Sequence, residues 1–194
     1  DGNDRVGEVI HASTTEFVTE CYTLYDNPPI GCLVECGEDN PVFGVVADSV
    51  TESIDPTRPP APKGKDMSSE REIYSENPQL SQLLATRFTS IIVGYVNESE
   101  IKWHLSPKPP RILSFVKICS TDQARDFSVD VGFLPRLLDS SVGSPDEVVA
   151  AYIRHAAEFQ TSSEEFVIRA GKELTERMPG QLRRVSAIIR TALR

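Results

Sequence analysis

Four cysteines and three histidines are the side chains of this 194-residue chain best suited to metal binding or nucleophilic chemistry. Cys32 and Cys36 are four residues apart, so both thiols lie on one face if the segment is a strand. A structural zinc site needs a second pair of cysteines or histidines at short spacing, and here the histidines are scattered. Because the sequence shows no secretory signal, we expect buried free thiols, with neither disulfides nor a metal ion.

A cysteine–histidine pair is the main catalytic alternative. Cys21 or Cys119 could meet His11 or His104 if their strands lie side by side, but cysteines in strands are more often core residues. A Gly-x-Ser-x-Gly nucleophile elbow does not occur, and Gly143-Ser144-Pro145 fits the start of a helix instead. We therefore expect no catalytic residue and no enzymatic activity.

Nucleotide binding and acid–base catalysis also lack the residues that they require. A phosphate-binding loop needs the spacing Gly-x-x-x-x-Gly-Lys-Ser/Thr, which neither Gly64-Lys65-Asp66 nor Gly171-Lys172-Glu173 provides. Glu8 and Glu16 could form a carboxylate pair for acid–base catalysis, although their strand positions favour solvated side chains. We expect no bound cofactor.

The elements that position these residues are short β-strands, which extend to about residue 120. Turn-forming residues separate the strands, as in Asp26-Asn27-Pro28-Pro29 and Gly37-Glu38-Asp39-Asn40-Pro41. Short strands at this spacing predict an antiparallel β-barrel of about six strands within residues 1–120. Segments with partly alternating β-branched, aromatic and cysteine side chains are 5–11, 16–24, 31–36, 42–50, 87–96, 101–105 and 112–119.

The segment from Thr51 to Asn77 interrupts this pattern because it is rich in proline and poor in apolar side chains. A long segment of this composition predicts a mobile loop over 51–77. The spacing Pro56-Thr57-Arg58-Pro59 also fits a polyproline ligand, which is the weaker alternative. Asn77-Pro78 then predicts the start of a brief helix over 78–86.

Beyond residue 120 the hydrophobic period becomes that of a helix, which predicts a small helical C-terminal domain of about three helices over 121–194. Ser144-Pro145-Asp146-Glu147 is a capping box that begins the first of them, and Ser162 precedes the second. Met178-Pro179-Gly180 ends the second helix. The overall class expected is α+β. The apolar stripe predicted for the third helix consists of Leu182, Val185, Ile189 and Leu193.

Charge is distributed unevenly along the chain, whose formal net charge is −9. Residues 134–194 contain nine basic and eight acidic side chains, whereas residues 1–133 contain 11 basic and 21 acidic ones. An acidic body repels phosphate, which argues against direct binding of nucleic acid. The last helix has no acidic residue, and its basic face is a candidate for docking to an acidic protein surface. The basic residues are Arg183, Arg184, Arg190 and Arg194.

Two aromatic residues are further candidates for an interaction surface. Trp103 is the only tryptophan and lies beside proline-rich turns, so we expect it to be half-buried in the packing of the barrel. If it were exposed next to Tyr95, the two rings would form a natural centre for binding a partner protein.

Five short motifs within the first 120 residues resemble a known family. They are similar to the HAS barrel, the small β-barrel at the N-terminus of HerA-type DNA-translocating ATPases and of the rotary ATP synthase α and β subunits. These motifs shape a barrel and therefore concern its fold more than its activity. They are Val6-Gly7-Glu8-Val9, Thr15-Glu16-Phe17, Phe43-Gly44-Val45-Val46, Ile92-Val93-Gly94-Tyr95 and Pro109-Pro110-Arg111.

The resemblance implies a role in holding subunits together or in presenting a docking surface to a partner. The ATPase domain of that family has no counterpart here, so none of its functional residues can be transferred. We therefore expect a non-enzymatic assembly or adaptor protein, which forms homo-oligomers and has a separate ATPase or nuclease as its partner.

Two other functions remain open. The first is a small ligand-binding or hydrolytic barrel that uses its mouth, the 51–77 loop and nearby Cys, His and Glu side chains. The second is a DNA-associated accessory factor bound through its basic terminus. No apolar run reaches the roughly 20 residues that span a bilayer, so we expect a cytoplasmic protein without direct membrane contact.

Overall fold

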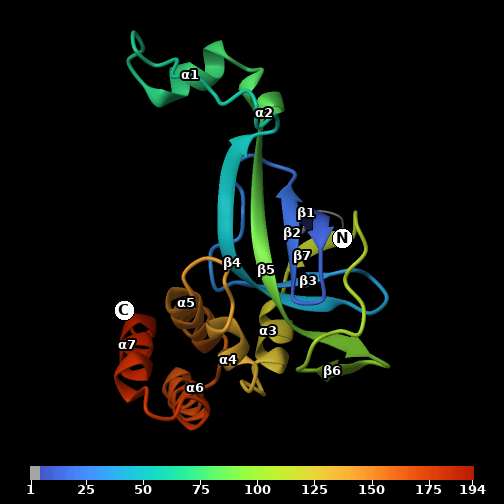
Figure 1. Ribbon diagram of the computed structural model, residues 1–194, viewed down its shortest axis with the longest axis vertical. Helices are drawn as coiled ribbons and strands as arrows, with labels where there is room; N and C mark the ends of the chain where they lie inside the picture. Colours follow the sequence, from blue (N-terminus) through green and yellow to red (C-terminus); the bar gives the residue numbers. More distant parts are fainter. Residues whose placement is uncertain (1–4) are drawn as a thin grey trace.

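Residues 5–194 are described by the computed structural model, and this part of the chain forms an antiparallel sheet of seven strands and seven helices (Figure 1). Every strand pairing is antiparallel, as the alternation and the tight turns predict. The α+β class is therefore confirmed. The strands are β1 (Arg5–Ala12), β2 (Glu16–Cys21), β3 (Leu33–Cys36), β4 (Val42–Ser53), β5 (Leu84–Asn97), β6 (Glu100–Lys102) and β7 (Phe115–Ile118).

Six of these strands are joined in a closed ring of hydrogen bonds. Each strand in the order β2-β1-β7-β3-β4-β5 pairs with the next, and β2 also pairs with β5. Glu16 of β2 lies opposite Ile91 of β5, and β6 continues the sheet beyond this point as a short hairpin. Closure of the ring removes most of the unpaired edges that an open sheet would expose.

The inside of the ring is filled by apolar side chains from all six strands. Successive residues of a strand face opposite sides of a sheet, so alternate residues of each strand point inward. Gly44 leaves room for the Phe17 ring, because a Cβ at Gly44 would lie 2.8 Å from Cε1 of Phe17. The buried residues of this ring interior are Val9, Phe17, Val34, Cys36, Val42, Val46, Phe88, Ile92 and Val116.

Strand β7 starts later than the sequence pattern predicts. The expected strand over 112–119 is shortened because the backbone turns at Leu113, whose φ is +66°. The side chains of Ile112 and Leu113 are exposed there, whereas Val116 within β7 is fully buried. All strand boundaries, those of β7 included, agree with the predicted ones to within three residues.

The β4–β5 hairpin extends beyond the ring and carries residues 54–83 at its tip, far from helices α3–α7 (Figure 1). Charged cross-strand pairs support this extension, because the guanidinium of Arg87 lies 2.9 Å from Glu20 and 3.1 Å from Glu52. β4 therefore continues to Ser53, three residues into the predicted loop.

The rest of the segment predicted as a mobile loop over 51–77 also contains regular structure. Helix α1 spans Glu70–Glu76 and begins at Ser69, whose hydroxyl accepts a hydrogen bond from the N–H of Glu72. The brief helix predicted over 78–86 is reduced to α2 (Leu80–Leu83), since β5 starts at Leu84. The hydroxyls of Tyr25 and Tyr74 lie 2.6 Å apart, and this contact ties α1 to the loop after β2.

Five helices follow β7, two more than the sequence analysis expects. The two additional helices, α3 and α4, are short. Helix α3 begins with a capping box in which the Ser120 hydroxyl accepts from the N–H of Gln123 and the Gln123 side chain accepts from the N–H of Ser120. The five helices are α3 (Thr121–Phe127), α4 (Leu134–Leu138), α5 (Pro145–Glu158), α6 (Ser163–Arg177) and α7 (Leu182–Ala192).

The predicted starts of the longer helices are correct, but one predicted cap is not formed. Ser162 caps α6 by accepting from the N–H of Glu165. Ser144 is the N-cap residue of α5, yet its side chain makes no capping hydrogen bond, so the predicted capping box is wrong there. Proline at the first position of α5 still favours a helix start, because its φ is already helical and no N–H is lost.

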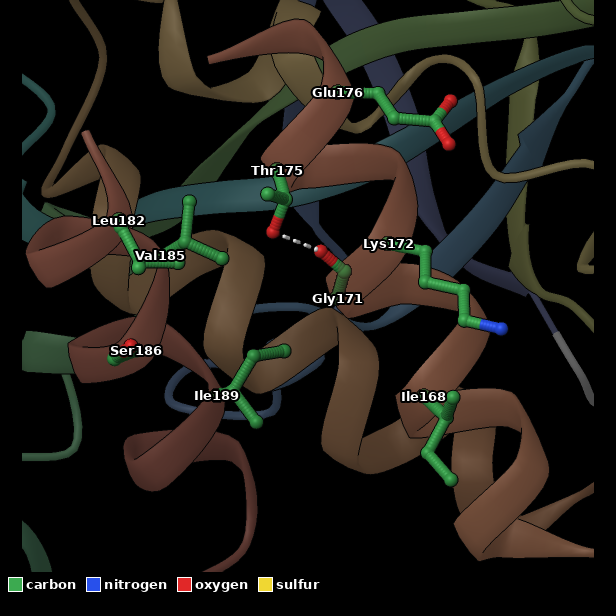
Figure 2. A pocket seen from close by; sticks show the side chains of 9 residues that line it. All are labelled: Ile168, Gly171, Lys172, Thr175, Glu176, Leu182, Val185, Ser186 and Ile189. Atoms are coloured by element: carbon green, nitrogen blue, oxygen red, sulfur yellow. Dashed lines mark hydrogen bonds between the residues drawn. The ribbon is translucent and has the colours of Figure 1, made fainter. Parts of the chain in front are cut away.

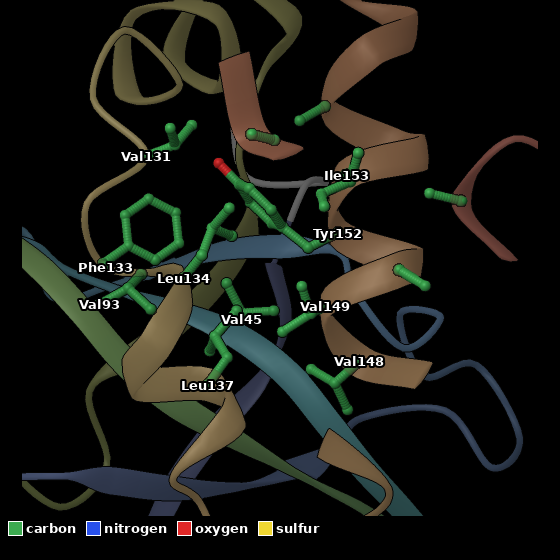
Figure 3. Packing of buried hydrophobic residues seen from close by; sticks show 14 of the residues in the cluster. Val45, Val93, Val131, Phe133, Leu134, Leu137, Val148, Val149, Tyr152 and Ile153 are labelled. Atoms are coloured by element: carbon green, nitrogen blue, oxygen red, sulfur yellow. The ribbon is translucent and has the colours of Figure 1, made fainter. Parts of the chain in front are cut away.

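Helices α4 and α5 pack on the outer face of the ring (Figure 3). Val45 of β4 and Val93 of β5 point outward and contact a layer that includes Leu134, Leu137 and Val149. Residues on both sides of residue 120 therefore contribute to one hydrophobic core. Within residues 5–194, no helix is long and apolar enough to cross a bilayer.

Candidate interaction surface

The two aromatic candidates lie on opposite faces of the sheet. Trp103 is half-buried, as predicted, and its indole N–H donates to the carbonyl oxygen of Phe127 at 2.7 Å. Tyr95 instead packs against the ring interior, with its ring centroid 5.3 Å from that of His104. Since Trp103 packs against the helix-side core, the structure does not bring the two rings together as one surface.

Arg184 differs from the other basic residues of the last helix because it is paired within the chain. Its Nε and Nη2 atoms donate to Oδ1 of Asp146 at 2.9 and 2.7 Å, and Nε also donates to Oδ2 at 3.1 Å. These hydrogen bonds raise the pKa of Arg184 further above its ordinary value. Arg184 therefore fastens α7 to the first turn of α5 and is not a free docking residue.

Arg183 and Arg190 on α7, and Arg194 two residues beyond its end, have exposed side chains. None of the three forms an ion pair with any residue in the described part of the chain, 5–194. Arg190 donates from Nε to the carbonyl oxygen of Ser186, one helical turn earlier, at 3.3 Å. These three guanidinium groups are available to acidic partners.

The apolar stripe predicted for α7 is only partly the one that is buried. The structure buries Val185, Ile188 and Ala192 against α5 and α6, whereas Leu182 and Leu193 are 64% and 68% exposed. At 100° per residue the large apolar residues from Leu182 to Leu193 span a sector of roughly 140°, which is wider than the side that faces the core. Packing on α5 selects that side and leaves the other stripe at the surface.

The exposed stripe of α7 forms one wall of an apolar groove of about 520 Å³ between α6 and α7 (Figure 2). We call this the α6–α7 groove. Ile168, half exposed, comes from the opposite wall on α6, where the Thr175 hydroxyl donates to the carbonyl oxygen of Gly171 at 2.8 Å. The groove is lined by Ile168, Gly171, Lys172, Thr175, Glu176, Leu182, Val185, Ser186 and Ile189.

The sequence pattern does not indicate this groove. The hydrophobic period predicts that Leu182, Ile189 and Leu193 face a core, and it predicts no interaction surface on α6. The signal that was present is the width of the apolar sector of α7, which exceeds what one buried stripe requires.

The four cysteines are free thiols divided between the two cores, and Cys36 and Cys119 are buried as predicted, whereas Cys21 and Cys32 are only partly buried. Cys32 and Cys36 both contact the ring interior, in agreement with the predicted common face. Burial raises the pKa of Cys32 to about 11 and that of Cys36 to about 12. Cys21 is partly buried, and burial, aided by Asp26, raises its pKa to about 11.

Cys119 belongs to the helix-side core, and its burial raises the pKa of the thiol strongly. Among residues 5–194, no hydrogen bond joins a cysteine to a histidine, and no group of three or more metal-ligating side chains comes together. A nucleophilic cysteine requires a lowered pKa, so the observed shifts are opposite to those of a reactive thiol.

Thiol alkylation should therefore be slow in the folded protein. The thiolate is the reactive form, and at pH 8 a thiol with a pKa near 11 to 12 is ionised at least about 100-fold less than one at its ordinary value. We expect iodoacetamide to label Cys32 and Cys36 at least about 100-fold more slowly than in the urea-unfolded chain. Peptide mass spectrometry measures each site separately, and fast labelling of Cys36 at pH 8 would contradict the packed ring interior.

The remaining acid–base candidates are also separated. Glu8 lies opposite Glu20 in the β1–β2 register, while Glu16 lies opposite Ile91 of β5. Glu8 accepts a hydrogen bond of 2.7 Å from the hydroxyl of Tyr22. The structure therefore does not assemble the carboxylate pair that the sequence leaves open.

A scan against protein-family models found no matching family, and a search of curated proteins found no similar sequence.

Proposed function

We propose that this protein is a non-enzymatic assembly module, built on a β-barrel of the HAS type, that forms homo-oligomers and presents a docking surface to a separate ATPase or nuclease. The observation that carries the proposal is the packed interior of the ring. Six strands contribute its apolar side chains, so the ring is occupied by its own core and offers surfaces for binding.

Two further observations support a binding role over a catalytic one. Leu182 of α7 is largely exposed and lines the apolar α6–α7 groove, and contiguous exposed apolar surface is typical of protein interaction sites. The thiol pKa values are raised, which disfavours nucleophilic chemistry. The free thiols also fit the reducing cytoplasm, which is the location that we propose.

The assembly role predicts a molecular mass above that of a monomer in solution. We expect light scattering after size-exclusion chromatography, at tens of micromolar protein, to give the mass of a dimer or a larger oligomer. The apolar groove should hold the copies together, and unpaired charges beside it should make the association weaker at high salt. A monomer mass of 21.5 kDa across all protein and salt concentrations would contradict self-association.

A further inference from the structure

The outer part of β4 is exposed on both of its faces, where the β4–β5 hairpin extends beyond the ring (Figure 1). All residues over 48–52 are exposed, although a strand that covers a core buries every second residue. In the described part of the chain, 5–194, only β5 pairs with this stretch, because the pairing of β3 with β4 ends at Val45. We call residues 48–53 the β4 edge.

The register of the β4–β5 hairpin determines which backbone groups of the β4 edge are free. The N–H of Ile54 donates to the carbonyl oxygen of Leu83 at 2.9 Å, and this register continues without a shift as far as Asp48. Hydrogen-bonded and non-bonded pairs alternate in an antiparallel ladder. Every second residue from Ile54 back to Asp48 therefore directs its N–H and C=O groups toward β5.

The N–H and C=O groups of Ser49, Thr51 and Ser53 consequently point away from β5. Within residues 5–194, no backbone hydrogen bond uses these groups. Unpaired main-chain groups along a strand are a template for another strand, and extended peptides bind to such edges by strand addition. The β4 edge therefore offers three residues whose donors and acceptors are both available to one further strand.

The side chains along the β4 edge have an excess of negative charge. Alternation places Asp48, Val50 and Glu52 on one face of the strand, and Val50 is 46% exposed. Arg87 is the only basic residue within 48–53 and the paired segment 84–89. Its guanidinium group lies opposite Val50 and already forms ion pairs with Glu52 and with Glu20 of β2. A basic segment beside the edge would therefore meet carboxylates.

We propose that the β4 edge binds an extended segment of a partner protein as an added antiparallel strand, and that this segment has the pattern Lys/Arg-x-Val/Ile-x-Lys/Arg. Its two cations lie opposite Asp48 and Glu52, and its central β-branched side chain covers Val50. Opposite charges and β-branched side chains that face each other across two strands stabilise their pairing. This inference rests on the docking role in the proposed function, and it names the kind of segment that docks.

A second copy of this chain fits the β4 edge less well than a basic segment does. Two such edges paired as antiparallel strands would bring Asp48 and Glu52 of both copies onto one face. Only the two Arg87 side chains would offset these four carboxylates, and each of them already pairs with Glu20 and Glu52. Like charges that face one another at an interface are unfavourable, so the edge favours a basic partner segment.

Hydrogen exchange followed by NMR tests the geometry of the edge in the free protein. The amides of Ser49 and Thr51 point outward, so we expect them to exchange at least about 10-fold faster than those of Val50 and Glu52, which bond to β5. Equally slow exchange at all four amides would mean that another strand already covers the edge. That result would overturn the proposal of an edge open to a basic partner.

A capped heptapeptide, Thr-Lys-Thr-Val-Thr-Lys-Thr, is the probe for binding. We expect it to shift the amide signals of Ser49 and Thr51 with a dissociation constant of about 1 mM or below. The matched peptide Thr-Glu-Thr-Val-Thr-Glu-Thr should bind at least about 10-fold more weakly, because its carboxylates meet Asp48 and Glu52. Both sequences read the same in either direction, so the comparison does not depend on the direction of the added strand.

Variants of the protein separate main-chain recognition from side-chain recognition. Thr51→Pro removes an outward N–H that no strand of the ring uses, and it should weaken binding of the lysine peptide at least about 10-fold. Thr51→Val keeps this N–H and should change the dissociation constant by less than about three-fold. Asp48→Lys combined with Glu52→Lys should reverse the preference, so that the glutamate peptide binds more tightly. Circular dichroism and thermal melting establish that the variants are folded, and the charge exchange decides the matter if Thr51→Pro is not.

The outcomes distinguish this inference from the proposed function. Strand addition at the β4 edge is overturned if the lysine peptide shifts none of its amide signals, if both peptides bind equally well, or if the charge exchange leaves the preference unchanged. The oligomer mass expected from light scattering is independent of these results. A monomeric protein that binds the lysine peptide at the edge would contradict self-association alone.

Discussion

Replacing Phe127 with alanine is expected to lower the free energy of unfolding by about 3–5 kcal/mol, the range for removing a fully buried phenylalanine. Phe127 of α3 is completely buried, and its ring lies 4.8 Å from that of Phe43 on β4 and 5.3 Å from that of Phe133. The ring thus joins the sheet to the helices. Trp103 also packs on it, with centroids 6.2 Å apart.

The same variant tests whether the chain has one cooperative unit or two. The sequence pattern predicts a β domain and a helical domain that meet at residue 120, and independent domains would unfold in separate transitions. The shared core predicts a single unfolding transition. Phe127→Ala should shift this whole transition to lower urea concentration. Urea unfolding followed both by Trp103 fluorescence and by far-ultraviolet circular dichroism measures this.

Val129→Ala is the matched control because the Val129 side chain is 64% exposed two residues later. We expect it to change the free energy of unfolding by less than about 0.5 kcal/mol. Two separate transitions in the Phe127→Ala variant, with only one of them shifted, would support the two-domain division and contradict the single cooperative core.

Replacing Gly31 with alanine is expected to lower the free energy of unfolding by about 2–5 kcal/mol, because it combines backbone strain with overpacking. Gly31 has φ of +81°, a conformation that L-residues rarely adopt. An added Cβ would lie 2.4 Å from the backbone carbon of Ala151 and 2.4 Å from the backbone nitrogen of Tyr152. Backbone atoms within a helix cannot move aside as the end of a flexible side chain can.

Gly37→Ala isolates the strain from the overpacking. Gly37 has φ of +95°, but an added Cβ would meet nothing within 4 Å. Replacing Gly37 with alanine should lower the free energy of unfolding by only about 1–2 kcal/mol, the value for the left-handed conformation alone. Thermal and urea unfolding of both variants measure the difference, which reports how firmly the loop before β3 is held against α5. If both variants lost the same free energy of unfolding, the loop before β3 would be able to move away from α5 with little loss of stability.

Local features of the chain could be predicted well from the sequence. Alternating β-branched residues and proline- or glycine-containing turns indicated the strands, because strand period and turn chemistry depend on near neighbours. Ser162 and Pro145 indicated the starts of α6 and α5 for the same reason. Helix α3 was missed although Ser120 and Gln123 have capping-box spacing, a signal as local as the others.

Features that depend on distant residues could not be predicted in this way. The long β4–β5 hairpin owes its extension partly to Arg87, whose ion pairs reach Glu20 and Glu52 on two other strands. The contact of Tyr25 with Tyr74 connects residues 49 positions apart. No pattern within a short window records such contacts.

The amino-acid sequence by itself determined the α+β class, the approximate strands and the main helices of this protein, since each follows from local preferences and the hydrophobic period. Only the tertiary structure decided which side of α7 is buried and which is left for a partner. The residues of α7 are apolar over a wide sector, and the choice depends on where α5 and α6 lie. Arg184 shows the same dependence, because its role follows from Asp146, 38 positions earlier, and its sequence neighbours give no sign of that pairing.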